Sequence, residues 1–365
     1  MTGRFASGTH ALPWATVNIL LLQLKRIGDL ILTTPAIDAV RKKFPEARIT
    51  LAVASECRDL APAIPNVDRF LIVRRNWRDI PIFLSVAMDR FEFCVDFTRN
   101  DRSAVLAYLS RAKKRIAAHR PRDEPEARTR VYTDFTERMG SLHTIDYHLA
   151  LLRPLGIENA PTKLHLNVPS VARYRAQTLL RQAKIDHQFA VFHPGAARAE
   201  KFWEADRWVE LINHARPKID IILTGTRSHF EQEHIQQIKT KLREPTPKGF
   251  ASPDHFGVAD LSGRTDLLTF AALIAQARLL ITVDSAAVHL AAATDTPQVV
   301  LFGPTNPFHW RPRESPALIL QGGSKTPVNE FESRQERLPM KQISTEQVID
   351  AMNCLLSAPA AAPVS

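Results

Sequence analysis

The feature that most constrains this chain is an alternation of apolar runs with helical patterns that occurs twice along its 365 residues. Runs that are apolar throughout are typical of parallel strands, because helices cover both faces of such a sheet. The runs of the first half are 17–23, 48–53, 69–73 and 91–97, and those of the second half are 189–192, 220–223, 279–283 and 298–302. The alternation therefore predicts two α/β domains, each with a parallel sheet and right-handed crossovers.

The stretch 161–169, PTKLHLNVP, is the best linker candidate between the two alternations. We predict a first domain at 1–165, a second at 166–343, and a closing helix with a disordered Ala/Pro-rich tail at 344–365. Helical patterns predict helices at 30–43, 143–155, 171–184, 206–215, 266–277, 284–294 and 344–356. Exposed or irregular segments are expected at 111–130, around a short strand at 115–118, at 242–256, and after Gly303-Pro304.

The net charge of +10 is uneven, because residues 1–165 carry 26 Lys and Arg against 18 Asp and Glu. A basic surface suits nucleic acid, anionic lipid or a phosphorylated substrate. Nucleic acid is disfavoured, because aromatic residues make up 7% of the chain and do not interleave with the basic runs. No apolar run reaches about 18 residues, so no transmembrane helix is expected. No signal peptide is expected either, because no continuous apolar region precedes Pro13.

The three cysteines, Cys57, Cys94 and Cys354, lie far apart, which favours a reducing cytosol over a disulfide framework. The chain has no G-x-G-x-x-G and no G-x-x-x-x-G-K-[ST] pattern. Their absence counts against a dinucleotide dehydrogenase and a P-loop NTPase. No H-E-x-x-H or D-x-D pattern occurs, so metal-dependent chemistry is not indicated.

The stretch 279–289, LLITVDSAAVH, is the strongest candidate for a binding site. A buried strand there ends in Asp284 and small residues and turns directly into a helix. Ligands of open α/β sheets bind beyond the carboxyl ends of the strands, and the free N–H groups of a helix start suit a phosphate. The alternative is an ordinary strand–helix turn capped by Ser285.

Four segments in this order resemble one family. They are LKRIGDLILTTPAIDAVRKKFP (24–45), VFHPGA (191–196), AEKFWEADRWVELI (199–212) and VDSAAVHLAAATDTPQVVLFGPT (283–305). They resemble glycosyltransferase family 9, the ADP-heptose:lipopolysaccharide heptosyltransferases, over about residues 17–310. The motif Asp284-Ser285-Ala286 is most like that of the third, branch-adding heptosyltransferase (heptosyltransferase III, the WaaQ type).

The resemblance implies a GT-B fold, in which two Rossmann-like domains with parallel sheets face a central cleft. The first domain would bind the acceptor and the second the nucleotide sugar. The implied reaction is an inverting, metal-independent and cofactor-free transfer of heptose from ADP-heptose to the lipopolysaccharide inner core. The implied enzyme is a monomer, peripheral on the anionic cytoplasmic face of the inner membrane. Two alternatives stay open: the same fold with another sugar nucleotide such as a UDP-sugar, and a non-catalytic relative.

The resemblance assigns catalysis to two residues. Asp29, beyond the first strand, matches the general base that takes the proton of the acceptor hydroxyl. Its alternative role is to cap the helix from Leu30 onward. Lys201 matches the cation that stabilises the departing diphosphate, with a solvated surface lysine as the alternative.

The remaining predicted site residues divide between donor and acceptor. The donor-binding residues are His193, Gly195, Thr224, Gly225, Gly263, Asp284, Ser285, Ala286 and His289. The family often has Gly where this chain has Ala286, and Ala excludes the loosest backbone conformations at this turn. His289 is equally well a core histidine. The acceptor-binding residues are Lys25, Arg26, Gly28 and Arg120, with Arg122 beside the last.

Overall fold

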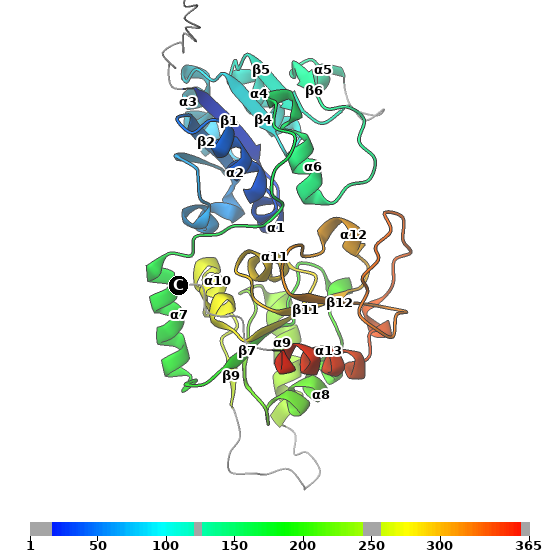
Figure 1. Ribbon diagram of the computed structural model, residues 1–365. Coiled ribbons are helices and arrows are strands. Elements are labelled where there is room, and N and C mark those ends of the chain that lie inside the picture. The colour runs from blue at the N-terminus through cyan, green and yellow to red at the C-terminus, as the bar shows by residue number, and fades with distance from the viewer. Residues whose placement is uncertain (1–16, 120–125, 244–256, 359–365) are drawn as a thin grey trace, which may run out of the picture.

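The structure is a computed structural model that describes residues 17–119, 126–243 and 257–358 (Figure 1). It contains two six-stranded parallel sheets. The first, ordered β3-β2-β1-β4-β5-β6, consists of β1 (Asn18–Gln23), β2 (Arg48–Ala54), β3 (Arg69–Val73), β4 (Phe93–Asp96), β5 (Lys114–Ala117) and β6 (Asp134–Phe135). The second, ordered β12-β11-β10-β7-β8-β9, consists of β7 (Phe189–His193), β8 (Asp220–Leu223), β9 (Val258–Asp260), β10 (Leu279–Val283), β11 (Gln298–Phe302) and β12 (Ala317–Gln321). The predicted α/β architecture is therefore confirmed.

Helices cover both faces of the first sheet, as its apolar strands require. Successive residues of β1 point to opposite faces, so Leu21 lies in one apolar cluster with Leu30, and Leu22 lies in another with Val86 and Leu106. The first face carries α1 (Ile27–Ile31), α2 (Thr34–Lys43), the 3-10 helix η1 (Ser55–Ala63) and α6 (Thr144–Ala150). The opposite face carries α3 (Ile80–Met88) and α4 (Asp101–Leu109).

The second sheet is covered in the same way. Leu280 of β10 packs with Leu273 and Leu290, whereas the next residue, Ile281, packs with Trp208 on the other face. The first of these faces carries α7 (Ser170–Gln182), α10 (Leu267–Gln276) and α11 (Ala286–Ala293). The other carries α8 (Ala205–Ala215), α9 (His229–Arg243) and α13 (Thr345–Ser357). The short elements are η2 (Trp77–Asp79), α5 (Glu126–Thr129), η3 (Arg153–Leu155), η4 (Ala199–Lys201), α12 (Pro307–Trp310) and η5 (Met340–Gln342).

The two units meet through one continuous apolar cluster. α1 contacts α11, and η1 contacts α10. Leu60 of η1 and Phe270 of α10 belong to the same buried cluster. Because α1 follows β1 and α11 follows β10, the carboxyl ends of central strands from both sheets meet at this junction.

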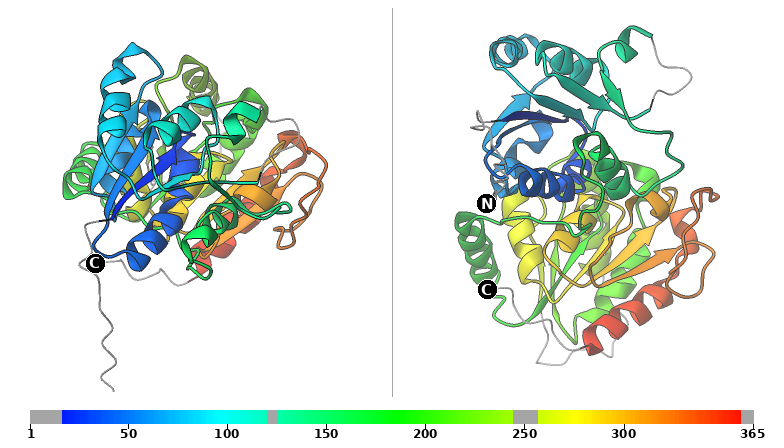
Figure 2. Two further views of the ribbon diagram at one scale, coloured as in Figure 1. Left: turned by 90° about the horizontal axis from the view of Figure 1, so that it is seen from above. Right: turned by 45° about the horizontal axis from the view of Figure 1, so that its top comes forward.

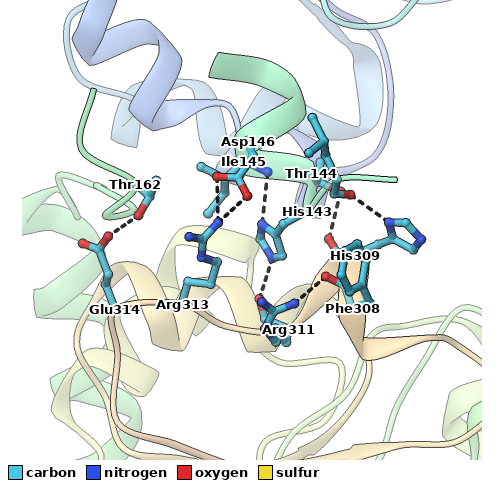
Figure 3. Close-up of polar contacts among 11 residues, drawn as sticks. His143, Thr144, Ile145, Asp146, Thr162, Phe308, His309, Arg311, Arg313 and Glu314 are labelled. Carbon is cyan, nitrogen blue, oxygen red and sulfur yellow. Dashed lines mark hydrogen bonds and ion pairs between the residues drawn. The ribbon is translucent and has the colours of Figure 1, made fainter. Parts of the chain in front are cut away.

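Polar contacts tie the start of α6 to the segment around α12 (Figure 3). Nη1 of Arg313 lies 2.8 Å from each carboxylate oxygen of Asp146. The neighbouring contacts join Nε2 of His143 to the Arg311 carbonyl and Oγ1 of Thr144 to the His309 carbonyl, each at 3.0 Å. The first and second units are thus linked by hydrogen bonds as well as by apolar packing.

The stretch 161–169, predicted to be a linker, contains no helix or strand. It runs along the junction and leads into α7, as Figure 1 and the right-hand view of Figure 2 show. Leu164 and Leu166 are buried in the shared cluster, and the N–H of Asn167 donates to the Ala63 carbonyl at 2.8 Å. The linker is therefore packed against both units.

Several element predictions are wrong in detail. The expected helix 30–43 is two helices, α1 and α2, because the chain turns at Leu32-Thr33 before Pro35. The segment after Pro304 is irregular only in part, since α12 and the edge strand β12 lie within it. β6 and β9, of two and three residues, were missed because they are too short to form a periodic pattern. The predicted loop 111–130 contains the short strand expected at 115–118, as β5, and also α5, which was not predicted.

The predicted loop 242–256 lies mostly outside the described residues, and so does the tail at 359–365. Among the helices that the structure describes, none is long and apolar enough to cross a bilayer.

Candidate active site

An ion pair between Lys201 and Asp284 lies at the carboxyl edge of the second sheet. Asp284 directly follows β10, and its backbone N–H donates to the Leu301 carbonyl at 3.1 Å. Lys201 ends η4, in the segment after β7, and donates from Nζ to the Asp284 carboxylate in a short contact. The side chains are only 16% and 10% exposed, so solvent screens their attraction weakly.

Helix α11 begins beside this pair. Ser285 is its N-cap, and Oγ accepts from the N–H of Ala287 at 3.3 Å. The capping role of Ser285 is thus confirmed. The same helix start brings its N–H groups next to the Lys201 ammonium, an arrangement that suits a phosphate. Ala286 is the first residue of this helix.

His289 stands one turn along α11 and contacts the first unit. A Cβ atom placed on Gly28 would lie 2.8 Å from Cδ2 of His289, so the absence of a side chain at Gly28 permits the contact. The ring is buried, and burial lowers the pKa of His289 to about 4, opposed by the negative charge of Asp284. Among the described residues, Nδ1 of His289 has no hydrogen-bond partner.

Asp29 lies inside the first turn of α1, next to Gly28. The alternative of an N-cap is wrong, because α1 begins at Ile27 and the N-cap is Arg26. Asp29 is 8% exposed, and burial raises the pKa of its carboxyl above the ordinary value. The positive charge of Lys25 and the Arg26 N–H oppose that shift in pKa. A carboxylate with a raised pKa is a stronger base than an exposed one.

His193 and Thr224 form a second polar pair at the ends of β7 and β8. Nδ1 of His193 lies 2.9 Å from Oγ1 of Thr224. Thr224 also donates to the Phe192 carbonyl at 3.3 Å, and the His193 ring lies 4.9 Å from the Phe270 ring. Burial lowers the pKa of His193 to about 4, so the ring is neutral near pH 7. Both residues lie where the sequence placed them, with their polar atoms paired to each other.

Glu231 is a buried carboxylate that sequence reasoning missed. It lies in α9, and Oε2 accepts from the N–H of Thr226 at 2.8 Å. A Cβ atom on Gly195 would overlap this carboxylate, so two predicted turns, those of Gly195 and Gly225, close over Glu231. A glutamate in the polar pattern HFEQEH gives no sign of burial; only its approach to two glycine turns reveals it.

The loop of Gly263 joins the same group. Gly263 has φ +70°, and its N–H donates to the Gly225 carbonyl at 2.9 Å. Nε of Arg227 donates to the Gly263 carbonyl at 2.8 Å. The loops after β8 and β9 are therefore held together.

The predicted acceptor residues lie around α1. Lys25 is half-buried, with Nζ 5.9 Å from the centre of the Tyr147 ring, and Arg26 is exposed. Arg120 and Arg122 lie outside the described residues. The structure therefore brings Lys25, Arg26 and Gly28 together with Asp29.

A hollow of about 680 Å³ lies between the loops that follow β7, β11 and β12, and sequence reasoning missed it. Its lining includes Arg198, Thr305, His309, Arg334 and Arg337, so cationic side chains predominate over its one acid, Glu336. In the part of the chain that the structure describes, no group of three or more His, Cys, Asp or Glu side chains is arranged to hold a metal ion.

Comparison with known proteins adds the family. The model of glycosyltransferase family 9 (heptosyltransferase) matches residues 83–339, well over half of the chain. The chain belongs to glycosyltransferase family 9. It is therefore a glycosyltransferase, as predicted from the four motif segments.

Individual heptosyltransferases and family 9 structures are similar to this chain over nearly its whole length. Lipopolysaccharide heptosyltransferase 3 of Escherichia coli is 23% identical over 90% of this chain and 96% of its own length. A family 9 structure from Veillonella parvula superposes with a TM-score of 0.78 at 23% identity, covering 93% and 97% of the two chains. The E. coli heptosyltransferase WaaC with ADP superposes with a TM-score of 0.66 at 19% identity, covering 92% and 97%. These structures share the GT-B fold that the sequence predicts.

Proposed function

We propose that this protein transfers heptose from ADP-heptose to the inner core of lipopolysaccharide. The proposal rests on a series of adjacent residues at the junction that connects the second unit to the first. The Lys201–Asp284 pair stands at the start of α11, His289 follows one turn later, and His289 contacts Gly28 beside Asp29. A donor site on the second unit and a base on the first would thus serve one reaction.

The second unit, residues 166–343, would hold the donor. The diphosphate would bind at the start of α11, where the Ser285 and Ala286 N–H groups and the Lys201 ammonium offer positive charge. Asp284 would accept hydrogen bonds from heptose hydroxyls, with His289 beside it. The glycine turns at Gly195, Gly225 and Gly263 and the His193–Thr224 pair would line the adenosine side. Binding of ADP by the related WaaC supports this donor.

The first unit, residues 1–165, would hold the acceptor. Lys25 and Arg26 would pair with its anionic groups, and Gly28 would let the acceptor approach α1 closely. Asp29 would take the proton of the attacking hydroxyl. The hydroxyl oxygen forms a bond to the anomeric carbon from the face opposite ADP, and the bond from that carbon to the diphosphate oxygen breaks. ADP leaves with the electron pair, and the centre is inverted.

Charge development explains the division of roles. The departing diphosphate gains negative charge in the transition state, and a fixed ammonium such as Lys201 stabilises that charge more than the ground state. Burial disfavours the charged form of the Asp29 carboxyl and raises its pKa, so the carboxylate accepts a proton more readily than an exposed one would. The proposed reaction needs neither a metal nor a cofactor.

The setting of the reaction is part of the proposal. The acceptor is anchored in a membrane and is anionic, which fits the excess of basic residues in 1–165. We place the enzyme as a monomer at the cytoplasmic face of the inner membrane, bound peripherally to its anionic surface.

The first test is thermal stabilisation by ADP, UDP, GDP, CDP and NAD, each with and without magnesium. A ligand that binds only the folded state raises the unfolding midpoint according to its occupancy. Selective stabilisation by ADP, unchanged by magnesium, is expected. Preference for UDP would replace the donor, and a lack of response to every nucleotide would point to a non-catalytic relative.

A further inference from the structure

The outer side of α3 and α4 is an apolar surface that no other part of the described chain covers. Six large apolar side chains are exposed there, and we call them the α3–α4 surface. They are Trp77 (76% exposed), Ile80 (54%), Leu84 (57%), Met88 (77%), Val105 (46%) and Tyr108 (65%). The described residues contain ten such exposed side chains, and six of them gather on η2 and the neighbouring helices α3 and α4.

The spacing of these residues along the sequence shows that they form one continuous apolar face. Trp77, Ile80, Leu84 and Met88 recur every three or four residues along the continuous stretch of η2 and α3, which places them on one side of the helix. The opposite side is already satisfied, because Val86 is fully buried against the first sheet. A helix that is apolar on its outer side as well as its inner side lacks a partner.

The two helices present their exposed side chains in the same direction. Both pack on one face of the first sheet, α3 through Val86 and α4 through Leu106. Val105 and Tyr108 of α4 therefore point away from that face, as the outer residues of α3 do. Tyr and Trp are the side chains enriched at membrane–water boundaries, where an apolar ring body and a polar tip are both satisfied.

Cationic side chains surround the surface. Arg74, Arg75 and Arg78 precede α3, Arg90 follows it, and Arg111 and Lys113 follow α4; all six are exposed. Among the described residues, none of the six has an ion-pair partner.

Nearby acids are already occupied. Asp79 is buried and accepts from the N–H groups of Arg74 and Arg75, each at 2.8 Å. Asp89 pairs with Arg69 at 2.7 Å. The surface thus combines apolar side chains with uncompensated positive charge, which is complementary to an anionic bilayer and not to a neutral one.

We infer that the α3–α4 surface docks the enzyme on an anionic phospholipid bilayer. The inference deepens the function proposed above and rests on it, because a membrane-anchored acceptor gives the docking its purpose. Arg74 to Trp77 follow the carboxyl end of β3, which lies at the same edge of the sheet as the Asp29 turn after β1. The Arg74–Trp77 end of the docked surface would therefore lie at the sheet edge that carries Asp29, near the membrane in which the acceptor sits.

The test is co-sedimentation of the full chain with vesicles of phosphatidylcholine plus phosphatidylglycerol, and with vesicles of phosphatidylcholine alone. Binding to the anionic vesicles only is expected for the wild type. Leu84→Glu/Met88→Glu should lower the partition coefficient at least tenfold, because two charges enter the apolar face. Arg74→Gln, Arg75→Gln and Arg78→Gln should each lower it roughly fivefold at low salt.

A matched control comes from α7 in the second unit. Val171 and Tyr174 are 60% and 65% exposed and lie one turn apart beside Arg173 and Arg175. Val171→Glu/Tyr174→Glu adds the same charge to an apolar pair of similar exposure and should leave vesicle binding unchanged. Equal losses in both double variants would overturn the assignment to α3 and α4.

Two further outcomes contradict the inference. One is wild-type protein that binds neither vesicle, and the other is wild-type protein that self-associates in ultracentrifugation until Leu84→Glu/Met88→Glu makes it monomeric. Stabilisation by ADP and transfer to a delipidated, water-soluble core acceptor should survive in that variant, which shows that it is folded. If the wild type does not transfer heptose to this water-soluble acceptor, the proposed function is contradicted, whereas the result on vesicle binding still stands.

Discussion

Gly28 and His289 lie in direct contact across the two units, close enough that a Cβ atom on Gly28 would come within 2.8 Å of Cδ2 of His289. The contact joins the turn that carries the proposed base to the helix that carries the proposed diphosphate site. If the proposed function holds, the length of this contact sets how near Asp29 comes to the donor, and the missing side chain of Gly28 would control the distance between the reactants.

The first prediction concerns that contact. Gly28→Ala should reduce turnover about a hundredfold, because a displacement of about 1 Å between reacting groups has a cost of this order. ADP affinity should change little. The control is Gly140→Ala, since a Cβ atom there would meet nothing within 4 Å. In a His289→Ala background the second substitution should cost much less, and full additivity in steady-state kinetics would contradict the contact.

The second prediction concerns the charge of Asp29. Asp29→Asn should abolish heptose transfer and leave ADP binding nearly unchanged, as isothermal titration would measure. Lost ADP binding with retained turnover would overturn the role of base. The exposed Asp59 in η1 provides the control, since Asp59→Asn removes an acid of the same unit outside the site.

Asp29→Asn should also make the fold more stable at pH 7. Burial raises the pKa of Asp29 in the folded state, so the folded state holds its proton more tightly than the unfolded chain. The wild type therefore loses stability as pH rises from about 4 through the raised pKa. The asparagine variant lacks this loss, so its advantage in unfolding midpoint should shrink as the pH is lowered to 4. An advantage that is constant with pH would mean that the carboxyl is not desolvated.

The third prediction separates stability from chemistry at the Lys201–Asp284 pair. Lys201→Met should lower the free energy of unfolding by about 3 kcal/mol, because a mostly buried carboxylate loses its partner. Lys201→Met/Asp284→Asn should regain most of that stability in denaturant titrations. Turnover should stay low in both variants, since the diphosphate still lacks its cation. Recovery of turnover in the double variant would show that Lys201 serves the fold alone.

The fourth prediction is loss of stability in acid. Burial lowers the pKa of His143, His193, His234 and His289 to about 4 each and that of His148 to about 3. Below pH 6.5 these histidine rings bind protons in the unfolded chain but stay neutral in the folded protein. The free energy of unfolding therefore falls from pH 6.5 down to about 4. Each ring contributes as much as about 1.4 kcal/mol per pH unit.

His234 allows a clean test, because it lies outside the proposed chemistry and stacks on Phe202 at 4.4 Å. His234→Phe should flatten the fall in unfolding free energy between pH 6.5 and 4 without changing turnover at pH 7.5. An unchanged slope would mean that the ring is charged in the folded state.

The fold was largely predictable because its signal is local. Fully buried parallel strands leave unbroken apolar runs, and the ranges of β3, β8, β10 and β11 match the predicted ones. β12 escaped because an edge strand after a proline-rich segment carries little periodicity. The division of one predicted helix into α1 and α2 escaped because both halves continue the same apolar pattern.

The site was predictable only in part, for a physical reason. Asp284 follows from the rule that ligands bind at the carboxyl edge of the sheet, whereas the role predicted for Asp29 came from the resemblance to the family. Contacts between distant segments do not follow from any such rule. The pairing of Lys201 with Asp284, the position of Glu231 beneath two glycine turns, and the meeting of Gly28 with His289 all depend on how the crossovers pack.

The apolar cluster at the junction has a consequence for how the chain comes into being. Leu60 of η1 is fully buried in a cluster that includes Phe270 of α10, a residue made more than two hundred residues later. During synthesis the first sheet can form together with its own helices. The apolar residues of η1 at the junction stay uncovered until the second sheet has formed. Each half is thus unfinished without the other, and heating should melt both in one cooperative transition instead of two.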